Sequence, residues 1–398
     1  MNDLRRILAV QALRAFAYGF GSVVLGAVLS SSGLTTVQVG LVFTSMLAGM
    51  ALSSVLVAFV GDRIGRRRIY VVLLLVMGIA GAVYALMRSI PVLVLVALTG
   101  TLSTDPNESG PITSIEQAMM ASAPREMRSR VFGRYNAVAY VAGAIGALAA
   151  GGSAVLRGSS VSVVEQRSLL VFIPIAVVCA LVASRLSSAV ESAHRAPGPR
   201  RPLHRSRSIV RRLSALFGLD AFAGGFVVQT FLVYWFGRRF GASTAVMGLA
   251  FFGAGLLQAV SSIVAGRLAA RIGLLNTMVF THLPSNMLLA VVPLMPSLPL
   301  AIAVLLARFA LSQMDVPARQ AYVVTMVDPD ERTAASALTN TARYVARPFG
   351  PFLGGALMQV ALGLPFVVAG ATKIVYDVAL YTLFRRVPEP AIEREPPP

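Results

Sequence analysis

The residues of this chain that could do chemistry are ionisable side chains inside long apolar stretches. Those stretches hold six acids and six bases, and each charge there is costly unless it is paired or hydrated. Asp105 and Glu108 lie three residues apart on either side of Pro106, so they share a face if the segment is helical. Two close carboxyls do not readily ionise together, which suits proton coupling or cation binding. Helix capping at the proline, or pairing with Arg14, are the structural alternatives.

Several other charges have possible partners close in the sequence. Asp315 lies seven residues from Arg308 and four from Arg319, which predicts an ion pair within one helix. Lys373 and Asp377 are four residues apart, and we expect them to neutralise each other.

Further polar residues interrupt the apolar stretches singly or in pairs. Asp220 lies near the start of one stretch, nine residues before Gln229. Glu116 lies near the end of another, where it suits a gating or structural role. His282 and Asn286 are four residues apart, and we interpret them as a packing pair.

Enzyme chemistry is not indicated by any of these patterns. No nucleophile is paired with a base, no spacing resembles a metal cage, and no phosphate-binding loop is present. Cys179 is the only cysteine, which excludes disulfides within the chain and cysteine-based metal clusters. We therefore expect no enzyme activity, cofactor, metal or ATP hydrolysis, but ion-coupled or facilitated transport.

The composition indicates an integral membrane protein. The chain has 398 residues, of which 56% are apolar and 13% charged, with a net charge of +18 and a mean hydropathy of +0.74. A basic chain can indicate nucleic-acid binding, but basic nucleic-acid surfaces are not embedded in long runs of Val, Leu, Ala and Ile. We therefore expect a lipid bilayer as partner and no nucleic acid.

Twelve apolar stretches are long enough to cross a membrane as helices. The sequence thus predicts an all-α polytopic fold with an N-terminal six-helix bundle (1–188), a basic cytoplasmic linker (189–212), a C-terminal six-helix bundle (213–384) and a disordered cytoplasmic tail (385–398). The predicted spans are 8–30, 37–60, 69–87, 90–122, 135–156, 168–188, 213–235, 244–265, 274–294, 298–326, 334–360 and 366–384.

The distribution of arginine supports this count. With the N-terminus inside, 24 arginines fall in segments on the inner side and 5 on the outer side. One missed helix would invert every later loop, and the asymmetry would be lost. The arginine asymmetry and the even number of spans together predict that both termini are cytoplasmic.

The fourth predicted span contains a loop-like segment, residues 102–111. Dividing the span there would leave two pieces too short to cross and would shift every later loop to the other side. We therefore predict one long helix interrupted at Pro106, whose ring removes a backbone hydrogen bond.

The two halves of the chain resemble each other. Residues 61–66, GDRIGR, follow the second span, and residues 266–273, GRLAARIG, follow the eighth. Glu126 and Glu331 follow the fourth and tenth spans at an offset of 205 residues. Such offsets indicate two parallel six-helix repeats that rock about a central site.

The loop after the second span carries a family resemblance. It is similar to motif A, G-x-x-x-D-R-x-G-R-[RK], of the major facilitator superfamily, with Ala58 in place of the first glycine. The second copy has Ala270 in place of the acid. An acid here can cap a helix and pair with arginine across the bundle interface, which would latch one conformation. The alternative is arginines that only set topology. The motif residues are Gly61, Asp62, Arg63, Gly65, Arg66 and Arg67.

A second match lies in the eleventh span. Gly350, Pro351, Gly354 and Gly355 resemble motif C, G-P-x-x-G-G, of the drug–proton antiporters in that superfamily. In those proteins the motif usually lies in the fifth span. Tight helix packing without antiport is an equally good reading.

The resemblance implies a central cavity lined by spans one, four, seven and ten. The residues it suggests for substrate or proton binding are Arg14, Asp105, Glu108, Asp220, Asp315 and Arg308.

These residues lead us to expect a secondary transporter, with proton-coupled efflux of a small molecule as the first hypothesis. The alternatives are an importer or uniporter of a small metabolite, and a non-transporting receptor or scaffold with the same fold. The mixed charge would suit a zwitterion or an organic anion as well as a cation. We expect a monomer in the cytoplasmic membrane.

Overall fold

The computed structural model describes residues 2–103, 105, 110–120, 125–157, 166–191, 205–328 and 331–387. For residues 2, 58–63, 125–130, 153–157 and 333 it describes the backbone only. The described residues form helices joined by turns, and no strand occurs among them. The prediction of an all-α fold is confirmed.

The helices before residue 192 correspond to the first six predicted spans. They are α1 (Asn2–Ser31), α2 (Thr36–Ile64), α3 (Arg66–Leu86), α4 (Ile90–Ala97), α5 (Pro111–Met120), α6 (Arg125–Arg157), and the 3-10 turn η1 (Ser168–Val171) with α8 (Phe172–Ser184), followed by the turn η2 (Ser188–Val190).

The helices after residue 204 correspond to the last six. They are α9 (Arg207–Gly225), α10 (Gln229–Phe240), α11 (Thr244–Ile272), α12 (Leu274–Val291) with the turn η3 (Val292–Leu294), α13 (Leu298–Ser312), α14 (Asp315–Thr325), α15 (Arg332–Ala346), α16 (Phe349–Val360) and α17 (Leu364–Phe384).

Nine helical segments in the described part of the chain are long and apolar enough to cross a membrane. The other three predicted spans are the divided fourth span, the shorter sixth span (Ser168–Ser184) and the eleventh, formed by α15 and α16. Each of the twelve predicted spans therefore contains at least one described helix.

The fourth span is divided more widely than the prediction of a single break at Pro106. α4 ends at Ala97, and residues 98–103, 105 and 110 are not helical, whereas Thr104 and residues 106–109, Pro106 among them, lie outside the described residues. Gly100 has φ = +67°, a left-handed conformation that ends a helix and that glycine adopts without strain. Pro111 then begins α5, where its missing N–H costs no helical hydrogen bond.

The second half begins earlier than predicted. α9 starts at Arg207, inside the segment 189–212 that we expected to be linker. Val210 and Leu213 are buried while Arg211 is exposed, so the first turns of α9 are amphipathic and not uniformly apolar. Residues 192–204 of the predicted linker and 388–398 of the predicted tail lie outside the described residues.

The two halves touch through close approach of backbone to backbone. The contacting helices are α1 with α10, α2 with α16, and α6 with α11. A Cβ atom added at Gly40 of α2 would lie 2.4 Å from the carbonyl oxygen of Pro351, and one at Gly355 of α16 would lie 2.3 Å from that of Thr36. Glycine is therefore required for this approach.

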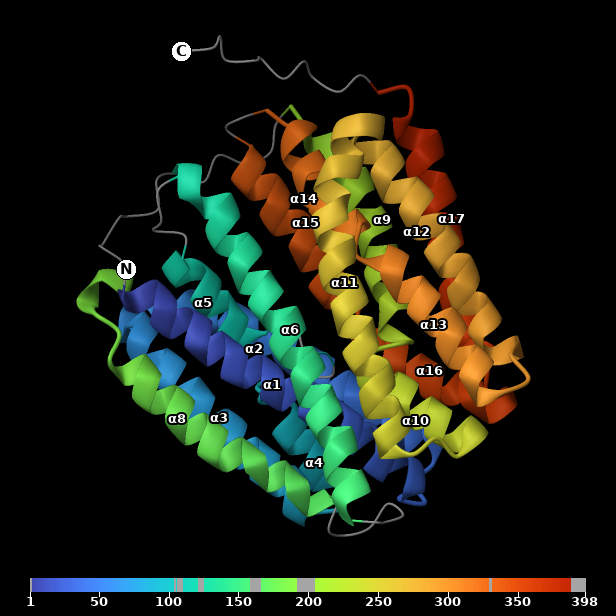
Figure 1. Ribbon diagram of the computed structural model, residues 1–398. Helices are drawn as coiled ribbons and strands as arrows, with labels where there is room; N and C mark the ends of the chain where they lie inside the picture. Colours follow the sequence, from blue (N-terminus) through green and yellow to red (C-terminus); the bar gives the residue numbers. More distant parts are fainter. Residues whose placement is uncertain are drawn as a thin grey trace.

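These contacts lie toward the end of the molecule where α2 and α11 begin and where α1 and α6 end (Figure 1). The largest apolar core includes residues of both halves, among them Phe43 of α2 and Phe231 of α10, whose ring centres are 5.6 Å apart. At the opposite end, α9, α14 and α17 have a separate core that contains residues of the second half alone.

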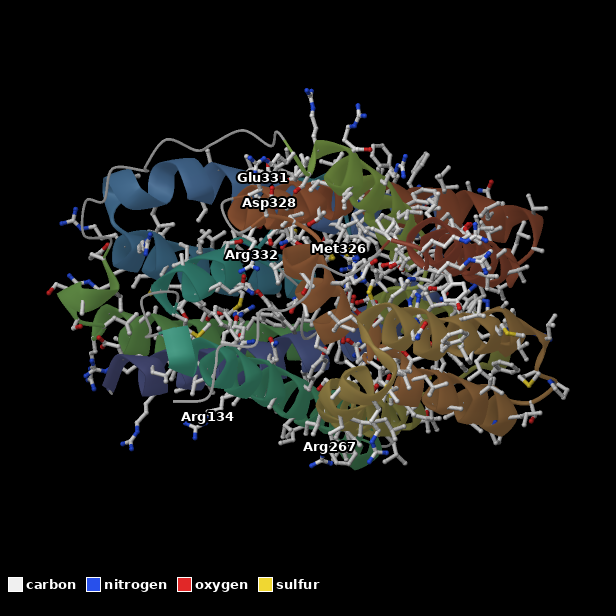
Figure 2. All side chains as sticks on the ribbon, turned by 90° about the horizontal axis from the view of Figure 1, so that it is seen from above. Arg134, Arg267, Met326, Asp328, Glu331 and Arg332 are labelled. Carbon is white, nitrogen blue, oxygen red and sulfur yellow. The ribbon has the colours of Figure 1, made fainter. Side chains whose placement is uncertain are left out.

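The end without a shared core is the one at which α1 starts and α17 ends. Figure 2 looks onto this end, with Arg134, Arg267 and Arg332 labelled on α6, α11 and α15. All three are among the 24 arginines that are predicted to lie on the inner side of the membrane. The halves are thus joined at one end and separate at the other.

The glycine contact predicts the effect of one added methyl group. Gly355→Ala is expected to push α16 away from α2 and to destabilise this arrangement by about 1–3 kcal/mol. We would measure the melting temperature in detergent and the distance between spin labels at Leu41 and Val360, which are both exposed.

Gly266→Ala in α11 is the matched control, because no atom lies within 4 Å of its added Cβ. Alanine should there stabilise the helix by about 1 kcal/mol. The same label distances and melting temperatures in both variants would contradict the steric argument.

Candidate functional site

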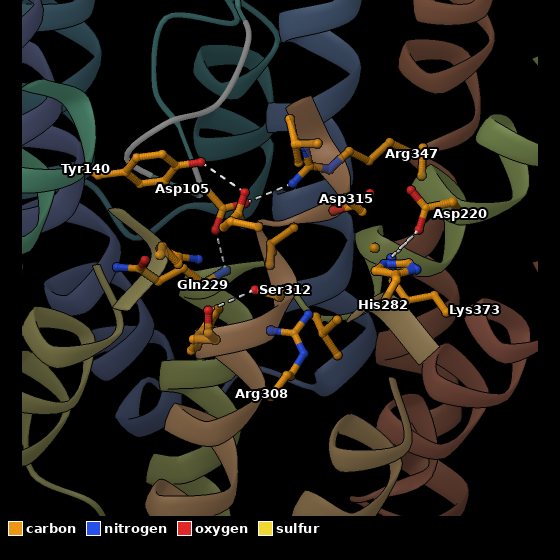
Figure 3. A pocket seen from close by; sticks show the side chains of 18 of the residues that line it. Asp105, Tyr140, Asp220, Gln229, His282, Arg308, Ser312, Asp315, Arg347 and Lys373 are labelled. Carbon is orange, nitrogen blue, oxygen red and sulfur yellow. Dashed lines mark hydrogen bonds and ion pairs between the residues drawn. The ribbon is translucent and has the colours of Figure 1, made fainter. Parts of the chain in front are cut away.

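A cavity of about 360 Å³ lies between the two halves (Figure 3). The fourth, seventh, tenth and eleventh spans each consist of two helices with a break between them, namely α4/α5, α9/α10, α13/α14 and α15/α16. Each break contributes a residue to the cavity lining: Asp105, Val228, Gln313 and Arg347. Irregular backbone at membrane depth is tolerated where it is buried in protein or lines a cavity. Among the described residues, the first half contributes Asp105 and three residues of α6 to the lining, and the second half contributes the rest.

Asp220 of α9 is the centre of a charge cluster at this cavity. Its carboxylate lies 2.5 Å from Nζ of Lys373, 3.0 Å from Nη1 of Arg343 and 3.3 Å from Nη1 of Arg319. Asp220 is 3% exposed, so these cations compensate a charge that is almost fully removed from water. The predicted pair within α14 is also present, at 2.9 Å between Arg319 and Asp315.

His282 of α12 joins this cluster to a second carboxylate. Its Nδ1 lies 2.8 Å from Oδ1 of Asp377, and its Nε2 lies 3.7 Å from Oδ1 of Asp220. Asn286 donates to the other oxygen of Asp377 at 2.8 Å. His282 and Asn286 therefore belong to the polar network beside the cavity, in contrast to the packing role that we expected.

The expected pair between Lys373 and Asp377 is wrong. Lys373 reaches across to Asp220 of α9, whereas Asp377 is held by His282 and Asn286 of α12. A spacing of four residues places two side chains on one face of a helix, but each of these has a closer partner on a different neighbouring helix.

Asp105 connects the two halves of the molecule. Its Oδ2 lies 2.9 Å from Nη2 of Arg347, and its Oδ1 accepts a hydrogen bond of 2.8 Å from the backbone N–H of Gln229. The alternative pairing of Asp105 with Arg14 is thereby excluded. Glu108, its predicted neighbour, lies outside the described residues.

Two further hydrogen bonds cross between the halves near Asp105. The Gln229 side chain donates to Oγ of Ser22 at 2.8 Å, and the Tyr140 hydroxyl donates to Oε1 of Gln313 at 2.9 Å. Polar contacts at the cavity wall therefore link helices of the first half to helices of the second half.

Arg14 lies outside the cavity that we predicted for it. It is 2% exposed and sits in the core of the first half, where its Nη2 is 2.6 Å from Oε2 of Glu116. The hydroxyls of Tyr70 and Tyr135 donate to the same carboxylate. The described partners of Glu116 are all buried within the first half, which favours a structural role over gating.

Arg308 of α13 lines the cavity, as predicted. Among the described residues no carboxylate lies within 4.0 Å of its guanidinium, and its buried Nε has no hydrogen-bond partner. The guanidinium lies 4.9 Å from the centre of the Phe309 ring.

The motif A segment forms the turn between α2 and α3. Gly65 has φ = +102° and precedes α3. The backbone N–H groups of Arg66 and Arg67 donate to the carboxylate of Glu191 at 2.7 and 3.3 Å. The side chains of Asp62 and Arg63, and the surroundings of Gly61, lie outside the described residues, so the proposed latch stays a prediction.

The motif C-like residues lie where helices approach one another closely. A Cβ atom at Gly350 would lie 2.6 Å from backbone atoms of Gly225, and one at Gly354 would lie 3.2 Å from the Phe231 ring. With Pro351 and Gly355 they form the surface of α16 against α2, α9 and α10. Their described contacts are those of close packing.

The predicted site residues did not include five ionisable residues that the structure places at the site: Arg319, Arg343, Arg347, Lys373 and His282. All five were visible as ionisable residues in apolar stretches. Their proximity to Asp220 and Asp105 depends on contacts between distant parts of the chain, which no local pattern reveals.

Known proteins resemble this chain over nearly its whole length. An uncharacterized membrane protein of Saccharomyces cerevisiae, YJR124C, is 27% identical and covers 96% of this chain and 94% of its own length. The family model described as Major Facilitator Superfamily matches residues 7–238 and 213–398.

Solved structures share the fold at low sequence identity. The nucleoside transporter NupG has a TM-score of 0.71 at 15% identity over 97% of this chain and all of its own. The xylose transporter XylE from E. coli, in an inward open conformation, has a TM-score of 0.72 at 14% identity over 98% of both chains. A bacterial homologue of the human lysosomal transporter Spinster has a TM-score of 0.69 at 17% identity over 95% of this chain and 94% of its own. The helices, the cavity between two halves and the family model together establish that the chain belongs to the major facilitator superfamily.

Proposed function

We propose that this membrane transporter is driven by protons and exports a small-molecule substrate by alternating access. The family and fold support movement of a small molecule between two halves that open in turn. We further propose that it works as a monomer in the cytoplasmic membrane with both termini inside. The orientation is supported by Arg134, Arg267 and Arg332, three of the arginines predicted on the inner side, which lie at one end of the molecule.

The observation that carries proton coupling is the ion pair between Asp105 and Arg347. It joins the first half to the second at the cavity, and both side chains are partly exposed to it. Protonation of Asp105 would remove its charge and weaken the contact between the halves. Proton binding and the conformational equilibrium are then linked, as coupled transport requires.

The proposed direction of transport rests on a sequence motif and not on the geometry of the cavity. Export is supported by the likeness of Gly350–Gly355 to the antiporter motif. Import is the second candidate, because a structure described as the D-xylose–proton symporter shares the fold with a TM-score of 0.74 at 16% identity. The polarity of the pH gradient distinguishes the two: an acidic vesicle lumen drives accumulation by an antiporter, whereas an acidic exterior drives accumulation by a symporter.

The test is Asp105→Asn in proteoliposomes with an imposed pH gradient. A substrate would first be found by thermal-shift screening of the wild-type protein in detergent. We expect Asp105→Asn to lose gradient-driven accumulation by about 10-fold or more, because asparagine cannot take up the proton. Exchange of labelled for unlabelled substrate, which needs no gradient, should continue.

Asp328→Asn is the control, because the Asp328 side chain is 41% exposed and the residue is not among those that line the cavity. Full accumulation by Asp105→Asn would refute this assignment of the coupling group. Absence of substrate-induced proton flux in the wild-type protein would refute proton coupling as a whole.

A further inference from the structure

We propose that the substrate is an organic monoanion, with a carboxylate as the simplest case, and that Arg308 binds its charged group. This inference rests on the proposed transport function and names the class of solute that the same cavity would accept. It starts from a guanidinium at the cavity with which no described carboxylate forms an ion pair.

Each described carboxylate around the cavity has a basic partner other than Arg308. Asp220, Asp315 and Asp377 lie in one network with Arg319, Arg343, Lys373 and His282. Asp105 is paired with Arg347. Among the described residues, no carboxylate is left to form an ion pair with Arg308.

The position of Arg308 suits a bound anion. Figure 3 shows its side chain apart from both the Asp105–Arg347 pair and the residues around His282 and Lys373. Its Nε is buried without a hydrogen-bond partner in the described part of the chain. A partly buried guanidinium without an ion-pair partner is costly, so an entering anion recovers part of that cost.

Guanidinium also fits the proposed ligand by geometry. Its planar fork can donate two parallel hydrogen bonds to one carboxylate, which gives both affinity and orientation. A single cation without an ion-pair partner among the described residues favours one negative charge over two. A cationic solute would instead face an excess of positive charge.

The rest of the lining suggests a small, polar body for the solute. Around the cavity lie Ser312, Gln258, Gln320 and Asn340, which offer hydroxyl and amide groups to a solute. Phe251 and Leu232 supply apolar surface. A cavity of about 360 Å³ is at the lower end of the range for small-molecule sites.

Binding to the purified full chain in detergent tests the proposal. The probes are matched sets that differ only in the charged group: benzoate, benzamide and benzylammonium; nicotinate and nicotinamide; gluconate, glucose and glucosamine. We expect thermal stabilisation by one or more carboxylates and none by its neutral or cationic counterpart. Equal or stronger stabilisation by the counterparts, or no stabilisation by any carboxylate, would overturn the proposal.

Arg308→Gln should then weaken binding of the stabilising carboxylate by about 10- to 100-fold. Arg308→Lys keeps the charge but not the fork, so it should give an intermediate loss. Arg239→Gln is the matched control, because Arg239 also lies over the ring of the next residue, Phe240, but is exposed and outside the cavity lining.

Unchanged carboxylate affinity in folded Arg308→Gln or Arg308→Lys would overturn the assignment of this residue. The comparison of matched probes on the wild-type protein needs no variant, so it stands even where Arg308→Gln does not fold. Carboxylate binding without proton-driven flux would reject the proposed coupling and leave the anion site in place.

Discussion

Asp220→Ala is expected to abolish transport and to lower the free energy of unfolding by about 3–5 kcal/mol, the cost of leaving buried charges unpaired. The change removes the carboxylate that Lys373, Arg343 and Arg319 share. The three cations would then repel one another in a site with little water. We would measure the melting temperature in detergent together with substrate flux in proteoliposomes.

Asp220→Asn separates charge from shape. Asparagine has nearly the same volume and can still accept hydrogen bonds, so its melting temperature should lie between those of the wild-type protein and Asp220→Ala, while transport is still lost. Asp328→Ala, at an exposed acid, should change neither measurement. If Asp220→Ala melted at the same temperature as the wild-type protein, the ion pairs around Asp220 would be hydrated and would contribute little to stability.

Glu116→Ala should cause a comparable loss of stability, again about 3–5 kcal/mol, but through the first half of the molecule. It would leave Arg14 buried without its counter-ion and deprive the hydroxyls of Tyr70 and Tyr135 of their acceptor. Circular dichroism during heating in detergent would measure the loss.

Substrate affinity distinguishes this role from a role in the cavity. Neither Arg14 nor Glu116 is among the cavity lining, so the folded fraction of Glu116→Gln should bind substrate as the wild-type protein does. Glutamine keeps hydrogen bonds to the two tyrosines and should recover part of the stability. A large loss of substrate affinity in Glu116→Gln would contradict the structural role and would indicate that Arg14 takes part in substrate binding.

The sequence predicted this fold well because the bilayer constrains backbone and charge. Apolar length and the arginine asymmetry depend only on the local sequence and its membrane side, so the twelve spans follow directly. The early start of α9 was missed because its first turns alternate buried residues such as Val210 with exposed arginines. The wide break in span four was missed because Gly100, not Pro106, ends the helix.

The candidate site was predicted in its residue types but not in its pairings. The Asp315–Arg319 pair followed from a spacing of four residues on one helix. His282 and Asp377 are 95 residues apart, and Arg14 and Glu116 are 102 apart. Such pairs depend on which helices become neighbours, and the spacing of residues in the sequence carries no information about that.

The contact between the two halves also bears on how fast the transporter can turn over. Around Gly40 and Gly355 the helices of the two halves approach through bare backbone. At the same end, apolar side chains of both halves share one core, among them Phe43 and Phe231, and separation would expose them. The activation barrier for exchange between states would then include the loss of this apolar packing as well as the loss of polar contacts such as Asp105–Arg347. Turnover should therefore respond to the packing of the joined end as well as to local pH.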